Sequence, residues 1–397
     1  MLPEPNFINY RDRMLRDFCD MIAVDSPSLK ERKMAETVRK KLLAMGLEVY
    51  EDGAGEMAGG ECGNIIGALP GDADLPAAAL LAHMDTVGPC ANKRWTTDCG
   101  DNGDSQKCVV RSDGSTILGG DDAAGMLAAL EIVRRVKERG IRHGGIVVIF
   151  TIAEETGLFG AKYLDCDIIK KATGKGAFPE FCFVFDSGGA PGSVVSRAPS
   201  HTDVIITVKG VAAHAGIEPE KGVNAITALA EAVSLMPLGR IDAETTANIG
   251  VIRGGNARNV VCEIAVAEGE VRSHNKDKMY AQLAKMKESV AAACARRNAS
   301  FNFEEISSYN TFSLTRDDTV IKLLSAAAKT RGYELELIPS GGGSDANVLN
   351  AMGIPAANLP VGMYGVHGVN EYADLRETHE TVEMVTEAFR RLAEGDF

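Results

Sequence analysis

The sequence predicts an α/β fold: a main domain with a mixed, largely parallel sheet flanked by helices, interrupted by an α+β insert with an antiparallel sheet. Continuous apolar runs of strand length, at 76–82 and 146–152, are typical of strands that are buried on both faces. A helical pattern over 123–139 lies between them, and strand, helix, strand in this order forms a right-handed parallel crossover. The pattern changes near residue 198, and 203–209 alternates as an antiparallel strand does.

The length and composition indicate two globular domains. The chain has 397 residues, of which 45% are hydrophobic and 24% are charged. We expect a discontinuous main domain of residues 1–197 and 309–397 around an inserted domain of residues 198–308. The net charge of −13 argues against a nucleic-acid or anionic-membrane partner, because either polyanion would repel the chain.

The cysteines and the N-terminal residues bear on the cellular location. The nine cysteines are scattered and include no CxxC pair, so we expect reduced thiols and no disulfide framework. The first residues, Met1–Pro5, lack the basic and apolar regions of a secretory signal. No apolar run is long enough to span a membrane. The cytoplasm is therefore the expected location.

The N-terminal elements lead to a first pair of candidate residues. Apolar positions in 7–45 recur at helical spacing and break near Ser28, so two helices are expected, with Ser28 able to cap the second. The apolar strand 76–82 is followed at once by His83, and Asp85 stands two residues further on. Residues i and i+2 of a strand point the same way, so His83 and Asp85 project together. The pair suits a metal-binding histidine oriented by a carboxylate, and equally an ordinary polar pair at a strand end.

Two acidic pairs come next. Asp121 and Asp122 precede the predicted helix, and Glu154 and Glu155 follow the strand after it. Because the carboxyl ends of parallel strands meet at one edge of a sheet, both pairs and His83 are expected there. Adjacent carboxylates repel one another unless a positive charge lies between them, so this edge is a candidate metal site.

Two further residues repeat this placement. The apolar strand 181–186 ends at Asp186, although a single aspartate at a strand end is more often a turn residue than a ligand. His367 stands in a glycine-containing segment, 364–371. Histidine and carboxylate ligands without a thiolate suit zinc or another borderline divalent ion, and one carboxylate shared by two ions would make a two-metal site. Another carboxylate must then stay unligated to act as a base.

The remaining elements complete the two domains. In the insert, helices are predicted at 222–236 and 276–297, and strands at 203–209, 248–253, 259–267 and 269–273. The main domain resumes with predicted elements at 319–331, 335–339, 344–352 and 377–394.

The ordered motifs form a recognisable pattern. They are Ala82-His83-Met84-Asp85-Thr86, Gly120-Asp121-Asp122, Glu154-Glu155-Thr156-Gly157, Asp186 and His367. Together they resemble the co-catalytic zinc exopeptidase family, which includes peptidase T, glutamate carboxypeptidases and aminoacylases. The resemblance covers nearly the whole chain and is closest to the peptidase T-like branch, through 117–122, 212–222, 246–250 and 339–347.

The resemblance implies two zinc ions per chain, with cobalt or manganese as alternatives. By position, His83, Asp121 and Asp186 would bind one ion. Asp121 would also bridge to a second ion that is held by Glu155 and His367.

The resemblance also implies roles beside the ligands. Asp85 would orient His83, Asp122 would support the bridging residue, and Glu154 would be the general base for a water shared by the two ions. In the insert, His214 would stabilise the tetrahedral oxyanion, in some relatives from the partner subunit. A cis peptide bond that involves no proline is expected directly after the bridging aspartate.

The residues that would bind the substrate are less sharply defined. The segment that would hold a substrate carboxylate contains Asn256, Arg258 and Asn259. Arg253 is a rival to Arg258 for that role. Gly342 and Ser344 could form a backbone nest for an anion, or merely the start of a helix that Ser344 caps.

The resemblance thus implies a two-metal exopeptidase that cleaves short peptides, releasing the N-terminal residue as a tripeptide aminopeptidase does. The enzymatic alternatives are an N-acyl amino acid amidohydrolase and a carboxypeptidase, and the non-enzymatic one is a metal-free peptide-binding relative. The insert would be a lid, and it could pair two chains as a homodimer.

Overall fold

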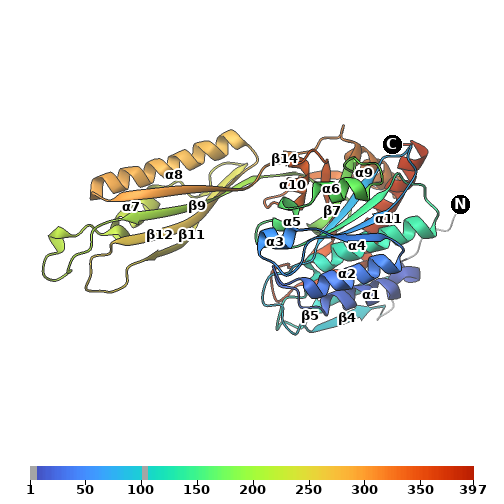
Figure 1. Ribbon diagram of the computed structural model, residues 1–397, viewed down its shortest axis with the longest axis horizontal. Coiled ribbons are helices and arrows are strands. Elements are labelled where there is room, and N and C mark those ends of the chain that lie inside the picture. The colour runs from blue at the N-terminus through green and yellow to red at the C-terminus, as the bar shows by residue number, and fades with distance from the viewer. Residues whose placement is uncertain (1–6, 101–105) are drawn as a thin grey trace. The chain divides into compact units, whose positions relative to one another are not determined.

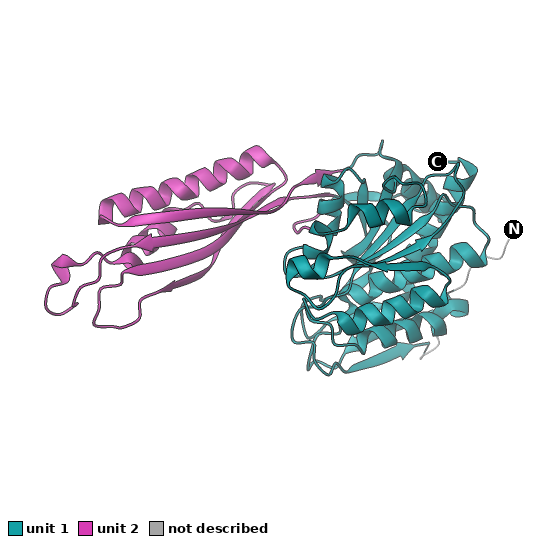
Figure 2. Ribbon diagram, viewed as in Figure 1, with its two compact units in different colours: residues 1–196, 314–339, 344–397 teal, residues 197–313, 340–343 magenta. Residues whose placement is uncertain are grey.

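The structure, a computed structural model, describes residues 7–100 and 106–397 and divides into two compact units. Figure 2 colours them separately. Unit 1 comprises Met1–Ser196, Leu314–Pro339 and Ser344–Phe397, and unit 2 comprises Arg197–Ser313 and Ser340–Gly343. The predicted fold class is confirmed, because unit 1 holds a mixed sheet with parallel strands and unit 2 holds a separate antiparallel sheet.

Unit 1 contains both helices and strands (Figure 1). Its helices are α1 (Ile8–Ile22), α2 (Arg32–Ala44), α3 (Ala54–Ala58), α4 (Gly120–Glu138), α5 (Phe159–Lys162), α6 (Cys166–Ala172), α9 (Thr319–Thr330), α10 (Asp345–Ala351) and α11 (Leu375–Glu394). Its strands are β1 (Glu48–Glu51), β2 (Ile65–Leu69), β3 (Ala78–His83), β4 (Trp95–Cys99), β5 (Cys108–Ser112), β6 (Ile146–Thr151), β7 (Phe181–Gly188), β8 (Ser193–Ala198, whose last two residues belong to unit 2), β15 (Glu336–Pro339), β16 (Ala356–Tyr364) and β17 (Tyr372–Asp374).

The order of the strands positions the candidate residues. The main path of the sheet is β1-β2-β6-β3-β7-β16-β17-β5-β4. Within it, β6, β3, β7 and β16 are neighbours and run parallel. All of β3 and β6 is buried, which explains their continuous apolar sequences. The carboxyl ends of these parallel strands meet at one edge, which is where the polar candidates lie.

Unit 2 has its own sheet, ordered β10-β11-β12-β9-β13. Its elements are β9 (Ser200–Lys209), the 3₁₀ turn η2 (Pro219–Lys221), α7 (Ala225–Leu235), β10 (Gly239–Arg240), β11 (Thr245–Gly254), β12 (Ile264–Ser273), α8 (Lys276–Arg297), β13 (Ser300–Tyr309) and β14 (Phe312–Ser313). The alternating residues Val204, Ile206 and Val208 of β9 are buried and share a core with Leu229 of α7 and Met286 of α8. The chain enters and leaves unit 2 on paired strands, since Arg197 lies opposite Ser313.

One predicted detail of unit 2 differs from the structure. The two strands expected at 259–267 and 269–273 are the single strand β12. Gly269 does not interrupt β12; a Cβ there would lie 2.3 Å from the carbonyl oxygen of Asn248, opposite a register shift in β11.

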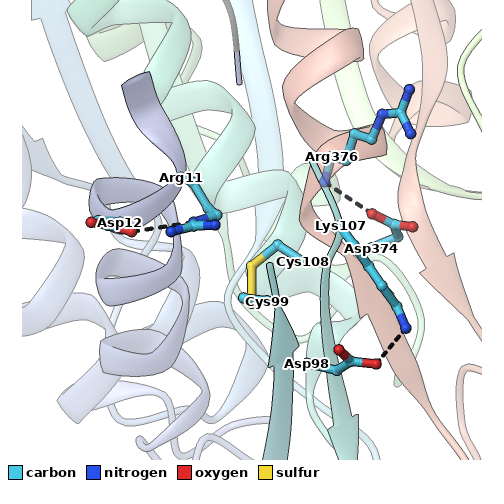
Figure 3. Close-up of a disulfide and its surroundings, with 8 residues drawn as sticks. All are labelled: Arg11, Asp12, Asp98, Cys99, Lys107, Cys108, Asp374 and Arg376. Atoms are coloured by element: carbon cyan, nitrogen blue, oxygen red, sulfur yellow. Dashed lines mark hydrogen bonds and ion pairs between the residues drawn. A yellow bond between two sulfur atoms is a disulfide. The ribbon is translucent and has the colours of Figure 1, made fainter. Parts of the chain in front are cut away.

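The prediction that the cysteines are all reduced thiols is wrong for two of them. Cys99 ends β4, Cys108 begins β5, and the two lie opposite each other in the antiparallel pair and form a disulfide. Figure 3 shows this bond beside the ion pair of Lys107 with Asp98 in the same hairpin. The other seven cysteines, all within the described residues, are free thiols. Across the same residues, no helix is long and apolar enough to cross a membrane.

A buried arginine joins three helices of unit 1. The Arg135 side chain of α4 is fully buried and forms ion pairs with Glu131 of α4 and Glu383 of α11. Its guanidinium also lies 2.9 Å from Nδ1 of His379 and 4.1 Å from the ring centre of Tyr10 in α1. These contacts hold α1 and α11 against α4, the helix whose first turn contains the candidate residue Asp121.

We expect Arg135→Met to lower the free energy of unfolding by about 3 kcal/mol, because it leaves Glu131 and Glu383 buried with less positive charge. Urea denaturation measures the change. The control is Arg390→Met on the exposed side of α11, where Arg390 pairs with Glu387 at 2.6 Å. That surface change should cost less than about 1 kcal/mol. Equal losses in the two variants would contradict the role of Arg135.

Candidate metal centre

The candidate residues gather at the carboxyl edge of the parallel strands in unit 1. His83 is the last residue of β3, Asp121 lies at the start of α4, and Asp186 lies near the end of β7. Glu155 follows β6, and His367 lies in the loop after β16. Segments from distant parts of the sequence thus supply one cluster.

The first group consists of His83, Asp121 and Asp186, whose ligand atoms all lie within 4.8 Å of one another. Nε2 of His83 is 3.0 Å from Oδ1 of Asp121 and 3.8 Å from Oδ1 of Asp186. The His83 side chain is only 2% exposed, and those of Asp121 and Asp186 are 10% and 15% exposed. These distances leave room for one ion between the three side chains.

The second group consists of Asp121, Glu155 and His367, again within 4.8 Å of one another. Nε2 of His367 is 3.2 Å from Oδ2 of Asp121 and 2.9 Å from Oε1 of Glu155. Asp121 therefore turns one carboxylate oxygen toward each histidine. This is the arrangement that a carboxylate bridging two ions requires.

The backbone around Asp121 is irregular. Asp121 and Asp122 have non-helical angles within the first turn of α4, and the peptide bond between them is cis, as expected from the resemblance. Asp122 turns inward, where its carboxylate accepts hydrogen bonds from the backbone N–H groups of His83 (3.1 Å) and Gly125 (3.0 Å). Asp122 thus connects the end of β3 to the start of α4.

The charges of the cluster need a cation. Burial, and then neighbouring carboxylates, raise the pKa of Asp186 and Glu154 well above the ordinary values. Burial disfavours the charged form of His83, yet its bonds to Asp121 and Asp85 raise its pKa. Hydrogen bonds to Asp121 and Glu155 raise the pKa of His367 to about 10. The raised pKa values of both histidines favour their positively charged forms in the metal-free chain. The donor set of imidazoles and carboxylates fits divalent ions of the zinc type.

Asp85 supports both His83 and the turn after β6. Nδ1 of His83 lies 3.0 Å from the backbone oxygen of Asp85 and 3.5 Å from its carboxylate, so Nε2 points to the cluster. The Asp85 carboxylate also accepts the backbone N–H groups of Glu154 (2.9 Å) and Glu155 (3.2 Å). One buried side chain thereby fixes the orientation of a ligand and the position of the acidic pair.

Glu154 lies close to the same cluster. Its ligand atom falls within 4.8 Å of those of His83 and Glu155, so proximity alone allows it to be either a ligand or an unligated base. The preceding residue, Ala153, has a left-handed φ of 49°, which turns the chain sharply between the strand and the acidic pair.

Three supporting residues were not found from the sequence. The hydroxyl of Ser28 donates to Asp85 at 2.6 Å; it does not cap α2, which begins at Arg32. Glu31 accepts the N–H of Ala153 at 3.0 Å, and burial raises its pKa to about 7. Asn358 of β16 bonds both the N–H and the C=O of Asp186, at 2.9 and 2.7 Å. In the sequence, only the break between the first two helices pointed to the segment that contains Ser28 and Glu31, and nothing there indicated their contacts with Asp85 and Ala153.

In unit 2, the proposed substrate residues lie on adjoining loops. His214 forms a β-bridge with Val260, and Ala215 donates to the backbone oxygen of Asn259 at 3.0 Å, so His214 lies beside the segment that contains Asn256, Arg258 and Asn259. All of these side chains are exposed. Arg253 lies on β11 and pairs with Glu268 of β12 at 2.9 Å.

The hydrogen bonds of the glycine-rich segment 340–344, just before α10, favour a helix cap at Ser344 over a backbone nest for an anion. Ser344 is the N-cap of α10 and forms a capping box with Asn347. The N–H of Gly342 donates to the Ser340 hydroxyl at 3.1 Å, and that of Gly343 donates to the Tyr309 hydroxyl at 3.0 Å. Protein side chains therefore take the backbone donors that a nest would offer to an anion.

Comparison with known proteins identifies similar chains of nearly equal length. The model of peptidase family M20/M25/M40 matches residues 79–391. The uncharacterized protein YqjE of Bacillus subtilis is 38% identical over 94% of this chain and 96% of its own. The crystal structure of aminopeptidase PepT from Bacillus cereus has a TM-score of 0.85 with 38% identity, covering 96% of this chain and 99% of that one. The crystal structure of a tripeptidase from Staphylococcus aureus has a TM-score of 0.87 with 32% identity, and it covers 96% of this chain and 98% of that one.

Zinc binding at pH 7.5 should release protons, because His367, with its pKa of about 10, is protonated in the metal-free chain and must lose that proton to bind an ion. Affinity should therefore rise with pH up to that value. The ion pairs of His367 stabilise the metal-free chain fully below its unfolded pKa of 6.5 and are lost as the pH rises through about 10.

Calorimetric titration in buffers of different ionisation enthalpy counts the released protons. His367→Gln should release about one proton fewer than the wild type. The control is His143→Gln, because burial lowers the pKa of His143. This variant should release as many protons as the wild type. An unaltered count in His367→Gln would show that His367 loses no proton when zinc binds, which would contradict the prediction.

Proposed function

The chain belongs to peptidase family M20/M25/M40, and from this we propose that it is a metal-dependent exopeptidase that removes the N-terminal residue from short peptides. The observation that carries the proposal is the Asp121 carboxylate, whose two oxygens face the histidines of two adjoining ligand groups. The aminopeptidase and the tripeptidase that match at 38% and 32% identity over nearly the whole chain support the choice of substrate and of the amino end.

We propose that two zinc ions occupy the site, with cobalt or manganese as alternatives. His83, Asp121 and Asp186 would hold one, and Asp121, Glu155 and His367 the other. When bound, such ions polarise the scissile carbonyl and lower the pKa of water.

Glu154 is proposed as the general base. The bonds from its N–H and that of Glu155 to Asp85 hold the acidic pair at the edge of the cluster. Glu154 would take a proton from the attacking water and then deliver it to the nitrogen of the leaving amine. Burial among carboxylates raises the pKa of Glu154, which favours its taking up a proton.

His214 and Arg258 are proposed to act on the substrate from unit 2. Gly216 donates to Nδ1 of His214 at 3.2 Å, so Nε2–H would be the donor to the oxyanion. Of the two arginine candidates, Arg258 suits the substrate carboxylate better, because Arg253 already pairs with Glu268. Asn256 and Asn259 would add hydrogen bonds beside Arg258.

Unit 2 is also proposed as a lid that pairs two chains. Strand β11 lies near one edge of its sheet, and β10 covers only Thr246 and Ala247 of it. Its Ile252 and the nearby helix residue Ile226 are 54% and 42% exposed. An uncovered edge strand is a template for pairing with another chain. Light scattering that finds only monomers would exclude this homodimer.

Glu154→Gln should lower kcat by about 10³-fold while the chain keeps its zinc, because only the proton acceptor is lost. Metal analysis and single-turnover rates measure the two effects. The matched variant Glu155→Gln should instead lose zinc. The opposite result, with zinc lost from Glu154→Gln and retained by Glu155→Gln, would exchange their roles.

A tripeptide with a free amino group should be cleaved at least about 100-fold faster than its N-acetylated form, because a site that binds the ammonium group rejects an analogue without it. Mass spectrometry of the products should find the free N-terminal residue. Preference for N-acyl amino acids would instead support an amidohydrolase, and release of the C-terminal residue a carboxypeptidase. A chain that binds peptide but no zinc, cobalt or manganese would be the non-enzymatic relative.

A further inference from the structure

One buried carboxylate beside the candidate metal centre has no part in the proposed mechanism. Glu371 is 1% exposed. Its Oε2 accepts the backbone N–H groups of Leu118 (2.7 Å) and Gly119 (2.9 Å), and its Oε1 accepts that of Asp121 (3.0 Å). Hydrogen bonds to an ionised acceptor are stronger than neutral ones, so this side chain holds the whole turn before α4.

Glu371 also belongs to the loop that carries His367. Its own N–H donates to the backbone oxygen of Gly368 at 3.2 Å, which closes the turn after His367. Its backbone oxygen accepts the N–H of Ser112 at the end of β5, at 3.0 Å. A single residue therefore joins the loop of His367 to the loop of Asp121, two ligands that share one proposed ion.

The three hydrogen bonds from the backbone of Leu118, Gly119 and Asp121 to Glu371 make this side chain a clamp on the turn before α4. The residues just before Asp121 suit this clamp. Gly119 has a left-handed φ of 76°, which lets successive N–H groups converge on one carboxylate. At Gly120, a Cβ would lie 3.0 Å from Oε1 of Glu371, so a side chain there would press on the acceptor. The two glycines thus give the backbone the shape and the space that the three hydrogen bonds need.

We propose that Glu371 is a positioning residue that sets the metal affinity of the centre by holding the main chain of Asp121 against the loop of His367. The carboxylate of Asp121 belongs to both ligand groups, so a displacement of its main chain would disturb both of them. The clamp resists that displacement, and the two oxygens of Asp121 stay aimed at His83 and His367. The inference rests on the proposed metal binding.

The decisive variant is Glu371→Gln. Glutamine has the same size, but its NH₂ group must face at least one backbone N–H that the carboxylate now accepts, and its charge is gone. We expect the dissociation constant for zinc, measured by competition with a chelator on metal-free protein, to rise about 10- to 100-fold. Saturating zinc should restore kcat to nearly that of the wild type, since no reacting group has changed.

The matched control is Glu377→Gln on α11. The Glu377 carboxylate accepts one hydrogen bond, from the Tyr364 hydroxyl at 2.7 Å, and an amide oxygen can replace it. Its zinc affinity should equal that of the wild type. Amide hydrogen exchange on the metal-free proteins gives a readout independent of activity: residues 118–121 should exchange faster in Glu371→Gln and unchanged in Glu377→Gln.

The outcomes separate the two proposals. Wild-type protein that binds no zinc, cobalt or manganese would overturn both. Wild-type protein that binds zinc, with Glu371→Gln binding equally well, would overturn the clamp alone. If Glu371→Gln does not fold, Glu371→Asp decides, because it keeps the charge but reaches less far: weakened zinc binding supports the clamp, and wild-type affinity overturns it.

Discussion

The repulsion between carboxylates at one edge of a sheet is the constraint on which the rest of the structure depends. Asp121, Asp186 and Glu155 lie within ligand distance of two histidines, and Glu154 adds a further acid. Such a cluster is unfavourable unless protons or metal ions balance its charge. The surrounding fold therefore has to hold these carboxylates in place against their mutual repulsion. Many of the hydrogen bonds around the cluster serve this purpose.

The restraint comes from backbone hydrogen bonds more than from contacts between ligands. The Asp85 carboxylate accepts the backbone N–H groups of Glu154 and Glu155. Likewise, Asp122 accepts the backbone N–H of His83, and Glu371 accepts the backbone N–H of Asp121. Asn358 fixes the backbone of Asp186 in the same manner. In each case a buried polar side chain holds the main chain of a candidate ligand or of the candidate base, so the candidate's own side-chain atoms are not used to hold the backbone.

The sequence revealed the candidate ligands better than the residues that support them. The candidate ligand His83, for example, stands at the end of an apolar strand, and strand-end placement is visible from local periodicity. The division of roles within Glu154-Glu155 came only from the resemblance to known peptidases. Ser28 and Glu371 bond to residues far away in the chain, so no local pattern could reveal them. The disulfide was missed for a similar reason, since the pairing of Cys99 with Cys108 depends on the register of a hairpin.

The place of β16 in the sheet determines when the centre can be completed during synthesis. This strand lies between β7 and β17, yet it follows β7 in the sequence only after the whole of unit 2. A nascent chain that has emerged only as far as unit 2 already carries His83, Asp121 and Asp186, but it lacks His367 and the strand that seats it. The group of Asp121, Glu155 and His367 can therefore form only after unit 2 has been synthesised, and the candidate metal centre of a nascent chain stays incomplete until β16 and the loop of His367 join unit 1.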